Sequence, residues 1–217
     1  MTKTNQQKVK DFLINNGVII VMFILVIYTG FTSDNFFTRN NFMNILMNMS
    51  SRLVIALGIA GCVITAGCDL SAGRMIGFGA CISGMLLQRM DYSGKFFPDM
   101  QPLNVFVVAL IAMLVCAAFG TVTGFFIAYL NVPPFIATLA MMEIVYGIGL
   151  IVTNATPLGG YVEQYTNVSN GKFLGINYLI WIAIIVAAIT WFIFNMTRHG
   201  KYMYAIGGNP QAAEVAG

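Results

Sequence analysis

The chain has 217 residues, of which 58% are hydrophobic and only 9% are charged. Soluble domains carry about 25% charged residues, so this composition excludes an ordinary soluble domain and indicates a membrane protein. The formal net charge of +3 is small and no basic run is interleaved with aromatic residues, which excludes nucleic acid as the expected partner.

Hydropathy predicts an all-α, polytopic transmembrane helical bundle within residues 1–204. A membrane-spanning helix needs about 20 mostly apolar residues, and about six stretches approach that length. The expected spans are residues 17–31, 44–66, 75–87, 105–130, 135–152 and 178–196. The third is short, and it is expected either to tilt or to begin inside the membrane.

The first span has two interpretations. Lys3, Lys8 and Lys10 precede the apolar run, an arrangement that both cleaved signal peptides and retained anchors share. The stretch Tyr28–Ser33 after it offers no small-x-small cleavage site. The retained anchor is therefore favoured.

The outer half of the second span is polar. Asn44, Asn48 and Arg52 recur through a stretch that is otherwise apolar. An ionised side chain in hydrocarbon is costly, so Asn48 and Arg52 are candidates for lining a water-filled translocation path. The alternative is a helix that enters from the interface, with Arg52 reaching outward to water.

A polar interruption follows the second span, from Thr65 to Gly73. Asp69 and Ser71 lie at its centre, and both residue types favour helix N-termini. One interpretation is an ordinary helix cap in a loop. The other is a broken helix at membrane depth, which is tolerated only where the backbone faces protein or water.

Glu143 is an acidic residue within the fifth span, and it is a further candidate for the path or for a structural polar contact. A pair between Arg52 and Glu143 is one alternative. Glycine pairs at four-residue spacing permit close helix packing in lipid, which favours a compact bundle. These pairs are Gly73 with Gly77 and Gly120 with Gly124.

No catalytic or metal site is expected. The four cysteines all lie in apolar stretches and include no Cys-x-x-Cys pair, and the single histidine, His199, cannot build a zinc site alone. Phosphate-binding loops, nucleophile elbows and dinucleotide fingerprints are absent from the sequence. The chain is therefore predicted to be no enzyme and to need no cofactor of its own. Energy for transport would come from an ion gradient or a separate ATPase.

The last segment, residues 205–217, is a helical candidate of soluble type directly after the basic cluster Arg198, His199 and Lys201. The positive-inside rule favours a cytosolic N-terminus, because six basic residues then lie on the inner side and four on the outer side. The inner residues are Lys3, Lys8, Lys10, Arg74, Arg198 and Lys201, and the outer residues are Arg39, Arg89, Lys95 and Lys172. Six spans then place the last segment in the cytosol, where it would meet a partner.

Three motifs in this order resemble the permease subunits of bacterial ribose/galactose-type ABC importers. They are Thr65–Arg74, Leu130–Leu139 and Thr197–Lys201 with Ala205–Pro210. The likeness extends to the galactose and methyl-galactoside branch through Leu86–Asp91 and Phe97–Met100. Cys68 and Ala66 depart from the usual first motif. Such permeases typically have about ten spans, so the chain corresponds to their N-terminal two thirds.

The resemblance implies a transport subunit in the bacterial inner membrane that moves a monosaccharide, galactose or a methyl-galactoside among the candidates. The implied partners are a second permease copy, the lipid bilayer, a periplasmic sugar-binding protein, and an ATP-binding subunit that holds ATP and Mg. The last segment matches the family's cytoplasmic coupling segment. The residues expected to contact the ATP-binding subunit are Gly207, Gly208, Asn209, Pro210, Ala212, Ala213 and Gly217.

Two other functions remain open from the sequence. An ion-gradient-driven secondary transporter of a small polar solute would need titratable groups at the midplane, and Glu143 is the clearest deep carboxylate. A membrane-embedded assembly factor would carry no flux at all.

Overall fold

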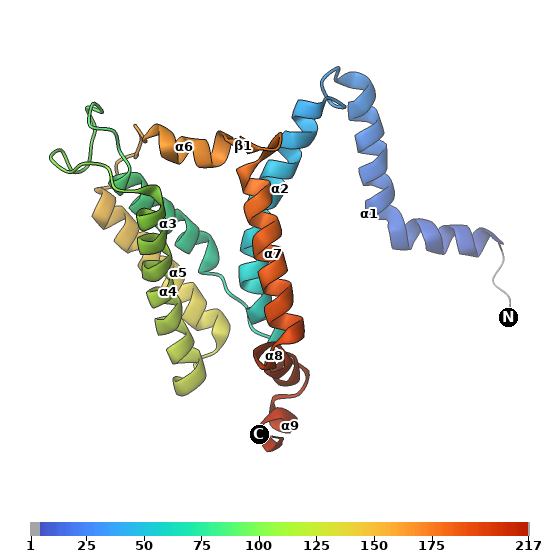
Figure 1. The fold of residues 1–217 in the computed structure, drawn as a ribbon. Helices are drawn as coiled ribbons and strands as arrows, with labels where there is room; N and C mark the ends of the chain where they lie inside the picture. The colour runs from blue at the N-terminus through green and yellow to red at the C-terminus, as the bar shows by residue number, and fades with distance from the viewer. Residues whose placement is uncertain (1–4, 217) are drawn as a thin grey trace. The chain divides into compact units, whose positions relative to one another are not determined.

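The computed structural model describes residues 5–216, with side chains described from Leu13 onward, and most of this stretch is helical (Figure 1). The elements are α1 (Asn5–Thr32), α2 (Arg39–Ile64), α3 (Ala72–Leu86), α4 (Val105–Leu130), α5 (Pro134–Thr153), α6 (Glu163–Asn170), β1 (Lys172–Phe173), β2 (Ile176–Asn177), α7 (Tyr178–Met196), α8 (Arg198–Gly208) and α9 (Pro210–Val215). The prediction of an all-α membrane bundle is confirmed.

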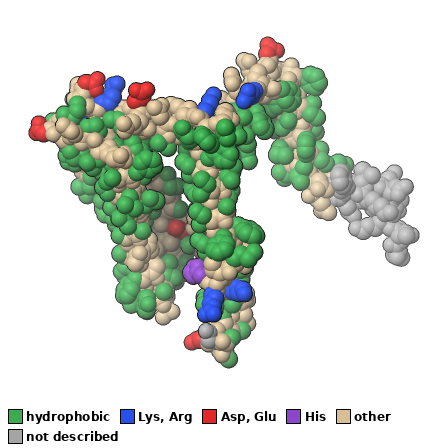
Figure 2. All heavy atoms as spheres, in the orientation of Figure 1, with side chains coloured by type: hydrophobic (Ala, Val, Ile, Leu, Met, Phe, Trp, Pro, Cys, Tyr) green, Lys and Arg blue, Asp and Glu red, His purple; other side chains and the backbone are tan. Residues whose placement is uncertain are grey.

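Within residues 5–216, five helices are long and apolar enough to cross a membrane, and α3 is a shorter apolar helix of 15 residues. The five stretches are Leu13–Thr32, Arg39–Ile64, Val105–Leu130, Pro134–Thr153 and Tyr178–Met196. Their hydrophobic side chains are largely exposed. In residues 49–216 most charged side chains visible in Figure 2 lie near the helix ends, with one acidic side chain between them. This surface suits lipid and partner helices as its surroundings.

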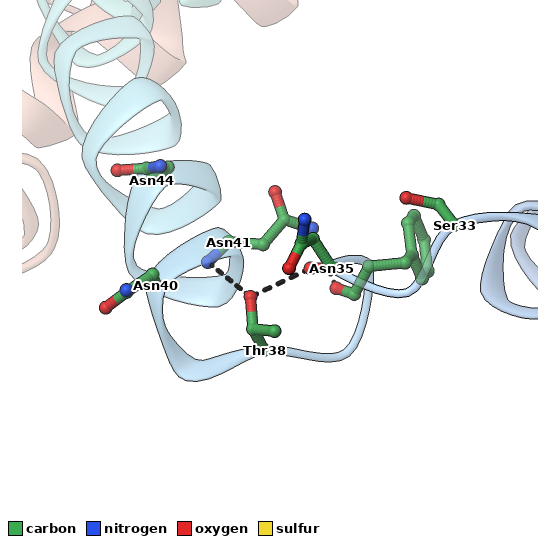
Figure 3. Close-up of a pocket in the computed structure, with 7 residues that line it drawn as sticks. Ser33, Asn35, Thr38, Asn40, Asn41 and Asn44 are labelled. Atoms are coloured by element: carbon green, nitrogen blue, oxygen red, sulfur yellow. Dashed lines mark hydrogen bonds between the residues drawn. The ribbon is translucent and has the colours of Figure 1, made fainter.

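The chain divides into two units at Asn48 and Met49, within α2. In the first unit, the turn after α1 is closed by its own side chains. Asn41 Nδ2 donates to the Phe36 carbonyl at 2.8 Å, and the Thr38 hydroxyl accepts from the Asn41 backbone N–H (Figure 3). Polar residues line a hollow of about 440 Å³ here, among them Ser33, Asn35, Asn40 and Asn44.

In the second unit, α3, α4 and α5 enclose the core. Phe78 and Ile82 of α3 are buried against Met141 and Val145 of α5. The Phe78 ring also meets Phe119 of α4 edge to face, with centroids 5.6 Å apart. Aromatic pairs prefer this geometry, so the three helices are fixed to one another by packing.

The turn between α4 and α5 is short because its residues stop one helix and start the next. Asn131 adopts the left-handed conformation, with φ of 53°, and its N–H bonds back to the Phe126 carbonyl. Pro134 begins α5, where a missing N–H costs nothing. The sequence predicted a tight turn at these residues.

The loops at the opposite end of the second unit are joined through Gln88, which is 1% exposed. Its Nε2 donates to the Gly159 carbonyl at 3.0 Å, and its Oε1 accepts from the Phe96 backbone N–H at 2.7 Å. Backbone bonds from Arg89 to Gly160 and from Val162 to Leu87 continue the link. We call this region, with Gln88 and Gly159, the loop end.

Tyr161 belongs to the same loop end. Its hydroxyl donates to the Leu158 carbonyl at 2.9 Å, and burial raises the pKa of this phenol above its usual value. Two loops far apart in sequence therefore form one ordered cover over α3 and α5.

The C-terminal part differs from the predicted single helix over Ala205–Gly217. Helix α8 begins already at Arg198, after Thr197, whose hydroxyl accepts from the Gly200 N–H at 3.3 Å. The boundary expected between residues 204 and 205 therefore falls inside α8. A second break at Asn209 separates α8 from α9, because Pro210 cannot continue a helix hydrogen-bond ladder.

Candidate functional site

The polar interruption is a non-helical segment that runs from Thr65 to Ser71, between α2 and α3. We call residues 65–71 the broken segment. Near its start, an added Cβ on Gly67 would lie 3.8 Å from the Pro134 side chain. Just beyond its end, the Arg74 guanidinium lies over the Tyr146 ring, 3.9 Å from the centroid. The broken segment therefore rises along α5 from that helix's first residue toward its middle.

This course sets the depth at which α3 begins. Tyr146 is twelve positions after Pro134, a rise of about 18 Å along α5. The hydrocarbon core of a bilayer is about 30 Å thick. Of the two expectations for the third span, the structure favours a helix that begins inside the bundle. Arg74 is consequently misassigned to the inner rim in the sequence-based charge count.

Asp69 and Ser71 form a local turn ahead of α3. Asp69 Oδ1 accepts from the Ser71 backbone N–H at 2.9 Å and from the Ser71 hydroxyl at 2.6 Å. Ser71 holds the N-cap position without a capping bond from its side chain. Of the two residues expected to cap the helix, Asp69 therefore supplies the hydrogen-bond acceptor of the turn. Ser71 occupies the N-cap position, and both its backbone N–H and its hydroxyl donate to Asp69.

A cavity of about 380 Å³ lies beside the broken segment. Thr65 and Asp69 line it from the broken segment, Thr123 from α4 and Thr138 from α5. Ile206 of α8 closes part of the wall. Irregular backbone at membrane depth needs protein or water beside it, and this cavity meets that requirement.

Replacing Asp69 tests whether the carboxylate acts as an acceptor or as a charge. Asp69→Asn keeps an oxygen for the Ser71 N–H, whereas Asp69→Ala removes it. If the turn matters through hydrogen bonding, uptake by reconstituted protein should fall for Asp69→Ala and remain close to wild type for Asp69→Asn. Equal loss in both variants would instead assign the role to the charge.

Helix α8 contacts the end of α2 where the broken segment begins. An alanine Cβ at Gly207 would overlap the carbonyl oxygen of Ile64 and lie 3.4 Å from Thr65 Cα. One turn earlier, Met203 lies so close to Gly61 that a Cβ there would be 2.8 Å from its terminal methyl carbon. The end of α8 is therefore in direct contact with the start of the broken segment.

The α8–α9 elbow is built around Asn209. Its side-chain oxygen accepts from the Ala212 N–H at 3.0 Å, which caps α9, and its own N–H bonds to the Ala205 carbonyl. A hollow of about 640 Å³ opens beside the elbow, lined among others by Tyr202, Pro210 and Ala213. Gly208 has open space around it, and Gly217 lies outside the described residues.

The other predicted path residues are not gathered into one cluster. Asn48 donates to the Asn44 carbonyl of its own helix at 2.9 Å. Arg52 and Glu143 are exposed and form no ion pair with each other among the described side chains, so the alternative of a pair between them is wrong.

The glycine pairs are also not used for packing within the described residues. An added Cβ at Gly73, Gly77, Gly120 or Gly124 would meet no atom within 4 Å. Gly120 and Gly124 line the cavity beside the broken segment instead of a helix contact.

Sequence reasoning missed Tyr146 and Gln88. Tyr146 looks like one more aromatic residue of an apolar helix, and only its position under Arg74 distinguishes it. Gln88 follows α3 directly, and a polar residue at the end of an apolar stretch is ordinarily a surface residue. No pattern in the sequence signals that Phe96 and Gly159 converge on its amide.

Comparison with known proteins places the chain in a transport family. The family model described as branched-chain amino acid transport system / permease component matches residues 41–217. The galactose/methyl galactoside import permease protein MglC of Escherichia coli is 39% identical over all of this chain and 67% of its own length. MglC of Haemophilus influenzae is 40% identical with the same coverage.

The ribose import permease protein RbsC of Escherichia coli is 31% identical over 96% of this chain and 62% of its own length. No solved structure matches the chain. The chain thus spans about two thirds of the length of its curated relatives, in agreement with the expectation that such permeases are longer. With its apolar helices, its broken segment and these relatives, the chain belongs to the permease-component family of bacterial ABC importers, as a multi-pass membrane protein.

Proposed function

We propose that the chain is the membrane-spanning part of an ATP-driven sugar importer of the inner membrane, with galactose or a methyl-galactoside as the cargo. The observation that carries the proposal is the contact of Gly207 with the Ile64 carbonyl, together with relatives named as galactose/methyl galactoside import permeases. In this proposal the N-terminus and α8–α9 face the cytosol, and a periplasmic sugar-binding protein delivers the cargo to the loop end.

The assignment of ATP hydrolysis to a partner subunit rests on a motif that the sequence lacks. It carries no phosphate-binding loop, so ATP and Mg would be held by a separate ATP-binding subunit. That subunit would dock at Gly207, Gly208, Asn209, Pro210, Ala212, Ala213 and Gly217. Two copies of the permease would enclose the path. The chain itself would then be neither an ATPase nor any other enzyme, and it would hold no cofactor.

Motion would pass from the partner through the elbow. Closure of the ATP-binding subunits would move α8–α9, and α8 would move Ile64 and Thr65 because their backbone leaves no gap beside Gly207. The broken segment follows directly in sequence, and Ile206 lines the cavity beside it. Displacement of this segment would open or close the cavity to the cytosol.

The experiment is reconstitution in proteoliposomes with an ATP-binding subunit and a periplasmic sugar-binding protein. Ala212→Trp puts a large side chain on the exposed face of α9, so it should abolish sugar-stimulated ATP hydrolysis while the protein stays folded. Ala188→Trp, on the exposed surface of α7, is the matched control and should leave hydrolysis intact.

Two outcomes would contradict the proposal. If the Ala212→Trp transporter still shows sugar-stimulated ATP hydrolysis at the wild-type rate, the elbow is not part of the interface with the ATP-binding subunit. Uptake that collapses with an uncoupler while ATP is held constant would instead establish the ion-gradient-driven transporter.

A further inference from the structure

A small hollow of about 200 Å³ lies between α3 and α5, apart from the cavity beside the broken segment. Arg74 and Gly77 line it from α3, and Tyr146 and Gly149 from α5. Pockets for drug-sized ligands measure about 300–1,000 Å³, so this hollow suits part of one small molecule. Its walls combine a guanidinium, the Tyr146 ring and backbone at glycines with apolar side chains, among them Phe78, Val145 and Leu150.

Arg74 is a charge in an unusual place. Its contact with Tyr146 puts the guanidinium over the middle of a helix that is long and apolar enough to cross the membrane. Such a charge at bilayer depth faces a bundle interior or a water-filled path rather than lipid. The Arg74 side chain has no carboxylate or carbonyl partner among the described residues, so its N–H donors are available to a ligand in that path.

The chemistry beside Arg74 suits a neutral polyhydroxy molecule. A guanidinium stacked on a ring keeps its N–H donors at the edge, where they meet hydroxyl oxygens. Glu143 is exposed three residues before Tyr146, on the same side of α5, and offers acceptors to hydroxyl protons. Each sugar hydroxyl both donates and accepts, so it finds a partner at either residue.

The helix surface next to these groups is open. A Cβ added at Gly73 or Gly77 would meet no atom of the described chain within 4 Å. The glycines therefore leave space beside the ring that no helix of the described chain fills. A sugar ring passing over Tyr146 would occupy this space.

We propose that Arg74 and Tyr146, with Gly77 opposite and Glu143 three residues before Tyr146 on α5, form a sugar-contact site within the translocation path. The proposal rests on the proposed function and adds the residues that touch the cargo. The site holds the sugar in transit and contributes to the choice among sugars that the delivering protein presents.

The test uses the full transporter in proteoliposomes and measures ATP hydrolysis and sugar uptake separately. Arg74→Ala and Tyr146→Ala should lower galactose uptake per ATP hydrolysed by about tenfold or more, the size of one charge-assisted hydrogen bond. Hydrolysis stimulated by the binding protein should persist. Tyr146→Phe keeps the ring and should transport like wild type.

Two further variants exclude a merely structural role. Gly77→Leu places its Cβ in open space and should block uptake without lowering the thermal stability. Ile144→Ala, another exposed position on α5, is the control and should be neutral. The ratio of galactose to glucose uptake should shift in Arg74→Ala and stay fixed in Ile144→Ala.

The outcomes are distinguishable from failure of the proposed function. If the wild-type complex shows no ATP-driven uptake, the proposed function itself fails. If the wild type transports and Arg74→Ala, Tyr146→Ala and Gly77→Leu match it in uptake per ATP and in sugar preference, the contact site is overturned.

Discussion

Gly207→Ala should uncouple the transporter. An alanine Cβ would overlap the Ile64 carbonyl oxygen, and backbone atoms cannot rotate away as a flexible side chain does. The end of α8 must therefore shift from α2, which costs about 1–3 kcal/mol as overpacking does elsewhere. Sugar uptake in proteoliposomes should fall by about tenfold or more, since each 1.36 kcal/mol on a rate-limiting step is tenfold. Hydrolysis by the bound ATP-binding subunit should continue without driving transport.

Gly208→Ala is the matched control for this variant. It is the next residue of the same helix, and its added Cβ would meet nothing within 4 Å. Because Gly208 also belongs to the proposed partner interface, the two variants are compared by their stability. The Tm of Gly208→Ala should rise slightly, because alanine favours helix over glycine, whereas the Tm of Gly207→Ala should fall. Uptake by Gly207→Ala equal to that of wild type would show that the contact with Ile64 transmits no motion.

Gln88→Leu should loosen the loop end. The leucine is similar in size but leaves the Gly159 carbonyl and the Phe96 N–H without their partner. Each of the two unsatisfied polar groups costs about 1–3 kcal/mol, so the free energy of unfolding should fall by about 2–6 kcal/mol. Thermal unfolding in detergent should show a lower Tm, and proteolysis should cut within residues 91–101 earlier than in wild type.

Gln101→Leu provides the comparison for Gln88→Leu. Gln101 lies in the same loop and is exposed, so the substitution removes an amide that water already satisfies. Its Tm and its protease pattern should match those of wild type. If Gln88→Leu unfolds no earlier than Gln101→Leu, the amide does not join the two loops.

The sequence alone predicted the class of protein because the bilayer imposes a strict rule on composition. A chain with 58% hydrophobic residues has few charged side chains to keep out of the hydrocarbon, and it forms the hydrogen bonds of its backbone N–H and C=O groups within helices. The bounds of α4 and α7 follow from the same rule, since polar and turn residues directly flank both apolar runs. Asn131 and Pro134 placed the turn before α5 by local backbone preference.

The broken segment was predictable as an interruption but its depth was not. Asp69 and Ser71 indicate a helix start in either a surface loop or the bilayer, because the local hydrogen bonds are the same in both. Only the contact of Arg74 with Tyr146, which are 72 positions apart, places the start of α3 within the bundle. Hydropathy assigned Arg74 to the rim because it considers a residue only with its sequence neighbours.

What the sequence determined by itself is therefore the membrane class, the helices and the likeness to sugar permeases. The tertiary structure decided which of the many glycines matters and where the charges face. Gly207 and Gly208 are adjacent and identical in sequence terms, yet one lies against the Ile64 carbonyl and the other has open space. Contacts between residues distant in the chain depend on how helices pack, and no local pattern records that packing.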